Sequence, residues 1–159
     1  MTIHKVDYSK IEEASDGGIL LFKVMMRLEF SLKHIGYCHL GSFPTAKVDW
    51  DRYVKERLGS TFWNKIQKDP EFQVLIQSPP KKQIVNQDGR LDWEPSAAVM
   101  SSQCLIGAVR RVRNNLFHGG KSGDPDVDRN ATLYKEALLV IDKILCEDRD
   151  LGAIFSGRY

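Results

Sequence analysis

The chain contains few of the residues that dominate non-globular proteins. Its 159 residues include only 12 glycines and 6 prolines, whereas 42% are hydrophobic and 28% are charged. This composition excludes collagen-like, low-complexity and fully disordered proteins. The length is that of one ordinary domain with room for a sizeable core, so we expect a single domain over residues 1–159.

Cysteine and long apolar runs are also scarce. The three cysteines, Cys38, Cys104 and Cys146, are odd in number and widely spaced, which favours free thiols in a reducing compartment over a disulfide framework. The apolar run Ile19–Phe22 ends at a lysine, and residues 1–9 lack the apolar centre of a secretory signal. We therefore expect a cytoplasmic protein that does not associate with membranes.

Net charge is low, but the basic residues are unevenly distributed. A formal charge of +2 does not by itself indicate a nucleic-acid-binding protein. However, residues 97–123 contain no Asp or Glu, and their second half carries Arg110, Arg111, Arg113 and Lys121. Basic side chains without nearby acids suit contact with RNA phosphates, although such residues often form only a solvated surface.

Apolar residues at three- and four-residue spacing predict a mostly helical chain. The predicted helices cover residues 19–37, 49–58, 71–77, 95–119 and 129–146, and a further short helix begins at Ser60. Between them, residues 79–95 contain a turn-forming stretch flanked by short apolar runs, which indicates a small hairpin or an irregular ordered loop. The expected fold is an all-α bundle of four or five helices with this insert.

The segment Arg110–Lys121 carries the clearest functional motif. Arg113, Asn114 and His118 match the signature of the HEPN family, in which an Arg and a polar residue precede a His. The wider phrases Arg27–Lys33 and Asn114–Lys121 resemble a HEPN branch of plasmid and mobile-element proteins. This resemblance implies a homodimer with composite sites at its interface and, often, metal-independent RNA cleavage. It also implies a toxin or defence effector, with an antitoxin or other regulatory protein as a possible partner.

The motif residues suit such chemistry on their own terms. RNA cleavage without a metal needs proton transfer and neutralisation of the charge on the phosphorane. His118 can transfer the proton, and the planar guanidinium of Arg113 can hold two phosphate oxygens. Asn114 lies one helical turn before His118 and can orient it or hold a phosphate. We expect no metal and no cofactor at this site.

The spacing of the motif leaves its assembly open. On a regular helix, five residues separate Arg113 from His118 by about 140°, so the two side chains do not share a face. Either the helix unwinds near Gly119, or an Arg and a His from different protomers complete each site. The purely structural interpretation is a basic helix end in which His118 caps carbonyls and Arg113 pairs with Glu29. A non-catalytic HEPN module that binds RNA, a nucleotide or a partner protein remains the alternative function.

The first predicted helix contains a charged residue in an unexpected place. Glu29 falls inside the apolar arc of its helical wheel, where an unpaired carboxylate would cost several kcal/mol or become protonated. We therefore predict that Glu29 is buried and paired with an arginine of the helix that carries Arg113, either Arg113 itself or Arg110. Such a pair is compatible with architecture and with a supporting role at the site.

Overall fold

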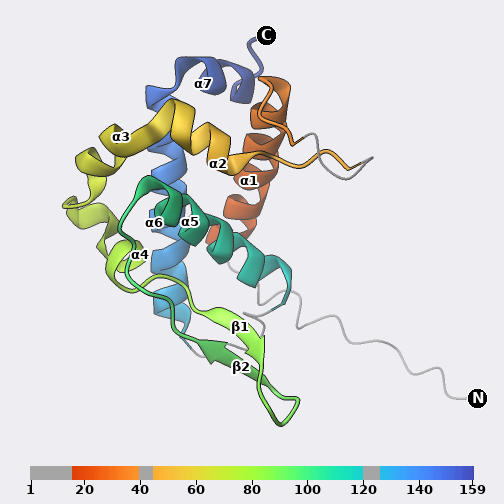
Figure 1. Ribbon diagram of the computed structural model, residues 1–159, viewed down its shortest axis with the longest axis vertical. Coiled ribbons are helices and arrows are strands. Elements are labelled where there is room, and N and C mark those ends of the chain that lie inside the picture. The colour runs from red at the N-terminus through yellow and green to blue at the C-terminus, as the bar shows by residue number, and fades with distance from the viewer. Residues whose placement is uncertain (1–15, 40–44, 120–125) are drawn as a thin grey trace, which may run out of the picture.

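The computed structural model describes residues 16–39, 45–119 and 126–159. It is a mostly helical bundle with a two-stranded antiparallel hairpin at one end (Figure 1). The elements, in chain order, are α1 (Asp16–His34), α2 (Trp50–Tyr53), η2 (Val54–Leu58), α3 (Gly59–Ile66), η3 (Pro70–Phe72), α4 (Gln73–Gln77), β1 (Lys82–Val85), β2 (Leu91–Glu94), α5 (Ser102–Phe117), α6 (Val127–Glu147) and α7 (Arg149–Phe155).

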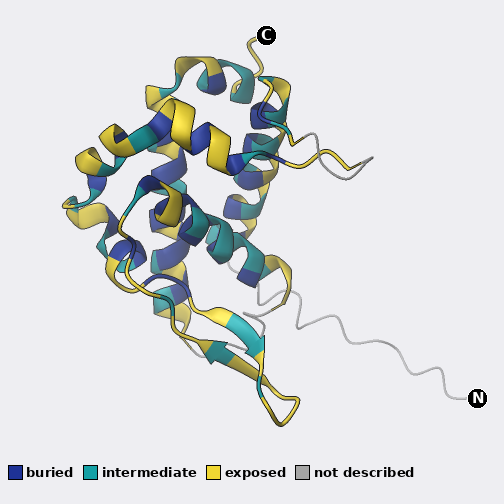
Figure 2. Cartoon of the chain, in the orientation of Figure 1, coloured by how far each residue is buried: buried dark blue, intermediate teal, exposed yellow. Residues whose placement is uncertain are grey.

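The core lies where α1, α5 and α6 meet. The α6 helix packs against α1, α4, α5 and α7, so it joins the two sides of the bundle. The inward faces of the helices are buried and their outer faces are exposed, as the predicted helical periodicity requires (Figure 2). The fully buried side chains include Leu21, Leu32, Leu105, Leu133 and Ile141. Within the described residues, no helix is long and apolar enough to cross a membrane.

The region after α1 begins as predicted and then departs from the prediction. Asp49 caps α2, because its carboxylate accepts a hydrogen bond from the backbone N–H of Arg52 at 3.2 Å. The second half of the predicted helix is the π-helical turn η2. The short helix predicted to begin at Ser60 is α3, which starts one residue earlier, at Gly59. The chain changes direction at Gly59, whose φ of +57° is not helical.

The insert is a hairpin rather than an irregular loop. Strands β1 and β2 pair in antiparallel register from Lys82↔Glu94 to Val85↔Leu91. The turn is closed by the side-chain oxygen of Asn86, which accepts from the N–H groups of Asp88 and Arg90 at 3.0 Å. Of the two forms predicted for the insert within residues 79–95, the structure shows the small β-hairpin.

Several helix boundaries differ from the prediction, and the start of the helix that carries the motif differs most. The α5 helix starts at Ser102, not at residue 95, because Ser101 caps it by accepting from the N–H of Cys104 at 3.1 Å. Residues 95–100 before it form no regular secondary structure, and Val99 N–H donates to the carbonyl of Ile76 at 2.8 Å. The structure also contains a helix that sequence periodicity did not reveal, α7.

The α7 helix is held at both ends by side chains from other elements. At its start, Asp148 accepts hydrogen bonds from the N–H of Leu151 and from the hydroxyl of Tyr53, each at 3.1 Å. At its end, Arg27 on α1 donates from Nε to the carbonyl of Phe155 at 2.9 Å and from Nη2 to that of Ile154 at 2.8 Å. These bonds satisfy terminal groups that a short helix cannot satisfy alone.

A buried glutamate joins α6 to α4. The side chain of Glu136 is 6% exposed, and its carboxylate accepts from the N–H of Leu75 at 2.6 Å and from that of Val74 at 3.3 Å. Burial raises the pKa of this carboxyl, while the two N–H groups act in the opposite direction. The carboxylate serves as a tertiary cap for the first turn of α4.

Candidate functional site

The predicted glutamate–arginine pair is present. Arg113 on α5 donates from Nη2 to Oε1 of Glu29 on α1 at 2.5 Å. The expected burial is wrong, because the Glu29 side chain is 29% exposed and that of Arg113 is 23% exposed. Glu29 faces the polar C-terminal half of α5 and borders a solvent-accessible pocket, so its carboxylate is shielded on one side only. The pair is therefore partly solvated.

A second arginine lies one turn earlier on the same face of α5. The guanidinium of Arg110 stacks on the buried indole of Trp50, with its carbon 5.3 Å from the ring centroid. Its Nε is buried without a hydrogen-bond partner, and so is Nε of Arg113. Burial, followed by the positive charge of Arg113, lowers the pKa of Arg110. Two partly buried guanidinium groups therefore lie close together beside Glu29.

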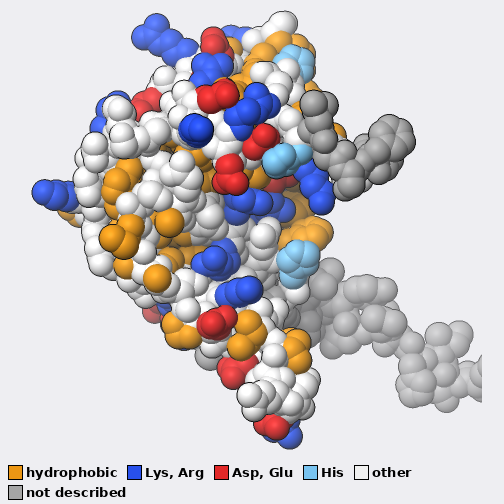
Figure 3. All heavy atoms as spheres, in the orientation of Figure 1, with side chains coloured by type: hydrophobic (Ala, Val, Ile, Leu, Met, Phe, Trp, Pro, Cys, Tyr) orange, Lys and Arg blue, Asp and Glu red, His pale blue; other side chains and the backbone are white. Residues whose placement is uncertain are grey.

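A pocket of about 300 Å³ opens between α1, α5 and the segment that leads into α2. Figure 3 shows Lys and Arg side chains across the middle of this face of the molecule, with histidines towards its right-hand edge. The charged and aromatic residues of the pocket lining are Glu29, Lys33, His39, Lys47, Trp50 and Arg110. The pocket thus extends from the Glu29–Arg113 pair to side chains that do not belong to the motif.

His118 lies at the other end of the motif, where α5 stops. It is the C-cap residue, and its backbone N–H donates to the carbonyl of Asn114 at 2.9 Å. Gly119 follows with a φ of +76°, the left-handed conformation that commonly ends helices. The imidazole is exposed and meets the Phe117 ring edge-on at 5.2 Å, and Phe117 in turn stacks on Phe22 of α1 at 5.7 Å.

The structure does not bring Arg113 and His118 together within one chain. Neither a hydrogen bond nor an ion pair joins them in the part of the chain that the structure describes. Arg113 faces Glu29, whereas His118 lies in solvent beyond the last turn of the helix. Asn114 is half-buried between them and contributes its carbonyl to the C-cap. This arrangement agrees with the angular separation expected from the sequence.

Arg111, predicted to contact RNA, has structural partners. Its Nη1 donates to the hydroxyl of Ser96 at 2.7 Å and to the carbonyl of Pro80 at 3.4 Å. The buried Asn115 donates from Nδ2 to the carbonyl of Lys81 at 2.8 Å. Both side chains tether the hairpin to α5, so RNA contact by Arg111 stays a prediction. Lys121, the other basic residue assigned to RNA, lies outside the described residues.

Three basic residues of the pocket were not among the predicted site residues. Lys33 lies one turn after Glu29 on the same helix, and this spacing is visible in the sequence. His39 and Lys47 are brought together by an isolated antiparallel bridge, in which the N–H of His39 donates to the carbonyl of Lys47 at 2.9 Å. No local pattern indicates that bridge, so only the tertiary structure reveals these two residues.

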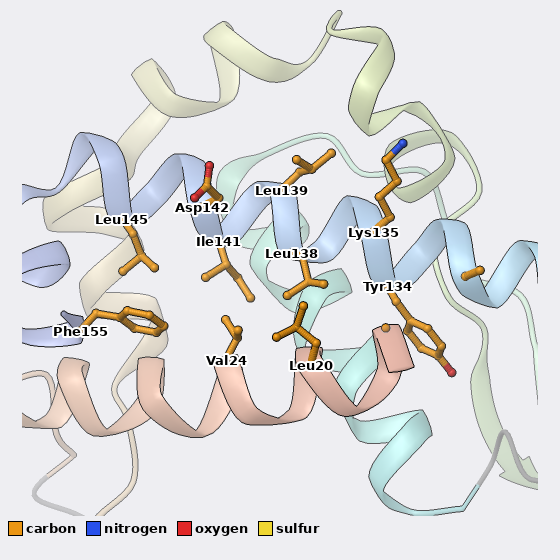
Figure 4. Close-up of a pocket in the computed structure, with 12 residues that line it drawn as sticks. Leu20, Val24, Tyr134, Lys135, Leu138, Leu139, Ile141, Asp142, Leu145 and Phe155 are labelled. Carbon is orange, nitrogen blue, oxygen red and sulfur yellow. The ribbon is translucent and has the colours of Figure 1, made fainter. Parts of the chain in front are cut away.

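A separate apolar groove of about 480 Å³ lies between α1 and α6 (Figure 4). Leu20 and Val24 point from α1 towards Leu138 and Ile141 on α6, and Phe155 closes one end. None of the predicted site residues that the structure describes lines this groove. The candidate site is therefore the contact between α1 and α5, where the predicted polar residues lie, and not this groove.

The α1–α5 region can bind an anion and can transfer a proton, because it contains guanidinium groups, lysines and an exposed imidazole. The described residues include no group of three or more His, Cys, Asp or Glu side chains that could hold a metal ion.

Comparisons of the chain with protein-family models, with curated proteins and with solved structures found no match. The resemblance to HEPN domains accordingly stays a prediction.

Proposed function

We propose that the protein is a metal-independent endoribonuclease of the HEPN type. The observation that carries the proposal is that both ends of the motif, Arg113 and His118, are accessible to solvent. Arg113 is partly exposed and held by Glu29, and His118 is exposed at the end of the same helix. Nη1 of Arg113 has no hydrogen-bond partner within the described residues, so it is available to an incoming phosphate oxygen.

The proposed reaction is attack of the RNA 2′-hydroxyl on the adjacent phosphorus. The new bond joins the 2′-oxygen to phosphorus, and the bond from phosphorus to the 5′-oxygen breaks. His118 moves the proton that leaves the 2′-hydroxyl towards the departing 5′-oxygen, and Arg113 neutralises the charge on the phosphorane. Asn114 holds His118 or the phosphate in place. The products carry a 2′,3′-cyclic phosphate and a 5′-hydroxyl.

We propose further that each site is completed by a second copy of the chain. The second copy would place its own His118 beside the Arg113 of the first, because the two residues do not meet within one protomer. In support, α1 carries exposed apolar residues on one face, at positions 19, 26 and 30, whose side chains are 42%, 54% and 41% exposed. Phe117, at 59% exposed, extends this apolar surface to the end of α5. Surfaces of this kind are typical of protein–protein contacts.

The cleavage proposal is tested with purified protein and mixed RNA in the presence of EDTA. The wild type should cut RNA but not DNA, and each of Arg113→Ala and His118→Ala should lose about two to four orders of magnitude in rate while remaining folded. Substrate with every 2′-hydroxyl methylated should survive. Cleavage of the methylated substrate would contradict the mechanism.

One observation favours the non-catalytic alternative. Glu29 already neutralises Arg113, as in a purely architectural pair. A wild type that binds RNA without cutting it, and variants that bind with unchanged affinity, would support a binding module instead.

The dimer is tested by light scattering at micromolar concentration. The wild type should have twice the mass of one chain, and Met26→Lys should shift it to a monomer and remove cleavage. Met100→Lys is the matched control, because Met100 is 78% exposed just before α5, outside the α1 stripe. A monomeric wild type would contradict this part of the proposal.

A further inference from the structure

The pocket beside the Glu29–Arg113 pair has more positive charge than its one carboxylate can balance. Its lining contains Lys33, Lys47 and Arg110, with Glu29 as the single acidic residue. That carboxylate already accepts from Arg113, which lies outside the lining. Neither lysine forms an ion pair within the described residues. The pocket therefore presents unneutralised cations.

Arg110 is fixed in a position where it gains from an anion. Its guanidinium stacks on Trp50, and no carboxylate pairs with it in the described part of the chain. The Nε atom is buried without a hydrogen-bond partner, so the protein itself does not satisfy this group. The pKa of Arg110 is lowered because burial and the charge of Arg113 disfavour its charged form more than the carboxylates of Glu29 and Asp51 favour it. A bound anion would offset both effects.

Two separate segments of the chain contribute the lysines to the pocket lining. Lys33 lies on α1, one turn after Glu29. Lys47 is placed opposite by the bridge between Cys38 and Val48, which pairs its carbonyl with the N–H of His39. His39 lies 3.7 Å from Asp49, so this aspartate is directed at His39 and Arg52 rather than at the lysines. Cations from two separate segments thus converge on one cavity.

We infer that this pocket is a phosphate subsite, which holds an RNA phosphate neighbouring the one that reacts at Arg113. The inference rests on the proposed function for its ligand, a single RNA strand. A volume of about 300 Å³ accommodates one small group rather than a duplex. Lysine is suited to this task because its ammonium binds phosphate as a point charge, without the planar geometry that arginine requires.

The test measures binding of a short single-stranded RNA whose 2′-hydroxyls are all methylated, so that cleavage cannot interfere. Lys33→Ala and Lys47→Ala should each weaken binding about three- to tenfold at low salt, and each should reduce the slope of log affinity against log salt by about 0.7. The matched control is Lys68→Ala, which removes the same charge from an exposed residue outside the pocket. Arg110 is left unchanged, because its contact with Trp50 makes it part of the packing.

The outcomes separate this inference from the proposed function. If the wild type cuts RNA but Lys33→Ala and Lys47→Ala bind RNA with the affinity of Lys68→Ala, the subsite is overturned and the proposed endoribonuclease activity stands. If the two lysine variants show the expected decrease in the slope of log affinity against log salt, but the wild type does not cut RNA, the subsite is supported and catalysis is rejected. AMP and inorganic phosphate form a second arm. If Lys47→Ala abolishes AMP binding while RNA binding is unchanged, the ligand is a free nucleotide and the inference is wrong. No RNA binding by the wild type would overturn both proposals.

Discussion

Glu136 and Glu29 are both glutamates on helices that face another helix, yet their surroundings differ in kind. Glu136 is buried and accepts from two backbone N–H groups of α4. Because the site is buried, water does not easily take the place of the carboxylate in these bonds. Glu29 is partly exposed and binds a side chain, that of Arg113, which is itself partly exposed. Glu136 therefore supports the fold through the backbone of α4, whereas Glu29 is placed to position a side chain of the candidate site.

Removal of Glu136 should have the largest effect on stability. The Glu136→Ala variant leaves the N–H groups of Val74 and Leu75 without their acceptor, and we expect a loss of about 2 to 3 kcal/mol in the free energy of unfolding. Glu136→Gln keeps one acceptor oxygen and should lose less. Urea denaturation followed by circular dichroism measures both values, and RNA affinity should remain unchanged. A variant as stable as the wild type would remove the contrast between the two glutamates.

The end of α5 should show a smaller effect on stability and a larger one on function. Gly119 adopts a φ of +76°, so Gly119→Ala should cost about 1 to 2 kcal/mol and displace the neighbouring His118. Gly119→Asn is the matched control, because asparagine tolerates this conformation better than alanine does. Denaturation and RNA cleavage are measured together. Equal cleavage by the alanine variant and the wild type would show that the position of His118 does not matter.

Removal of Glu29 should cost still less stability, because its pair with Arg113 is partly solvated. We expect Glu29→Ala to lose no more than about 1 kcal/mol. With Arg113 freed from its carboxylate, RNA binding should tighten, but cleavage at saturating RNA should slow because the guanidinium is no longer positioned. Glu29→Gln, which retains an acceptor oxygen, should show weaker changes in both. A purely structural pair would change stability without separating binding from the rate of cleavage.

The smallest expected effect is a dependence on pH. Burial raises the pKa of Glu136 in the folded protein, so the unfolded chain loses its proton at a lower pH than the folded chain does. The stabilisation from this group is therefore complete below the ordinary glutamate pKa and is lost as the pH rises through the raised value. Relative to Glu136→Gln, the wild type should lose stability over this range in urea titrations. A constant difference between the two proteins would contradict the assignment.

Much of the helical framework could be predicted because its signals are local. The apolar arc of α1 and the Asp49 cap depend only on neighbouring residues, and the position of Glu29 within that arc correctly indicated an arginine partner on α5. Its burial could not be predicted in the same way. Exposure of Glu29 depends on the cavity next to it, and that cavity is made by a segment about twenty residues further along the chain.

The errors have equally specific causes. Pro95 and Ser96 resemble a helix start, but Val99 N–H bonds to the carbonyl of Ile76 outside any helix, and Ser101 provides the cap instead. The α7 helix is short, and Arg27 on α1 supplies its terminal bonds from more than 120 residues away. The pairing of His39 with Lys47 likewise depends on a tertiary bridge. Contacts of this kind leave no periodic signal in the sequence.

The most direct test of the composite site is to mix two inactive variants. Arg113→Ala and His118→Ala are unfolded together, refolded as a mixture and assayed for RNA cleavage in EDTA. If each site takes Arg113 from one protomer and His118 from its partner, half of the dimers contain one intact site. The mixture should then recover about a quarter of the wild-type activity, while each variant refolded alone stays inactive. A mixture no more active than either variant, beside an active wild type treated identically, would contradict the account.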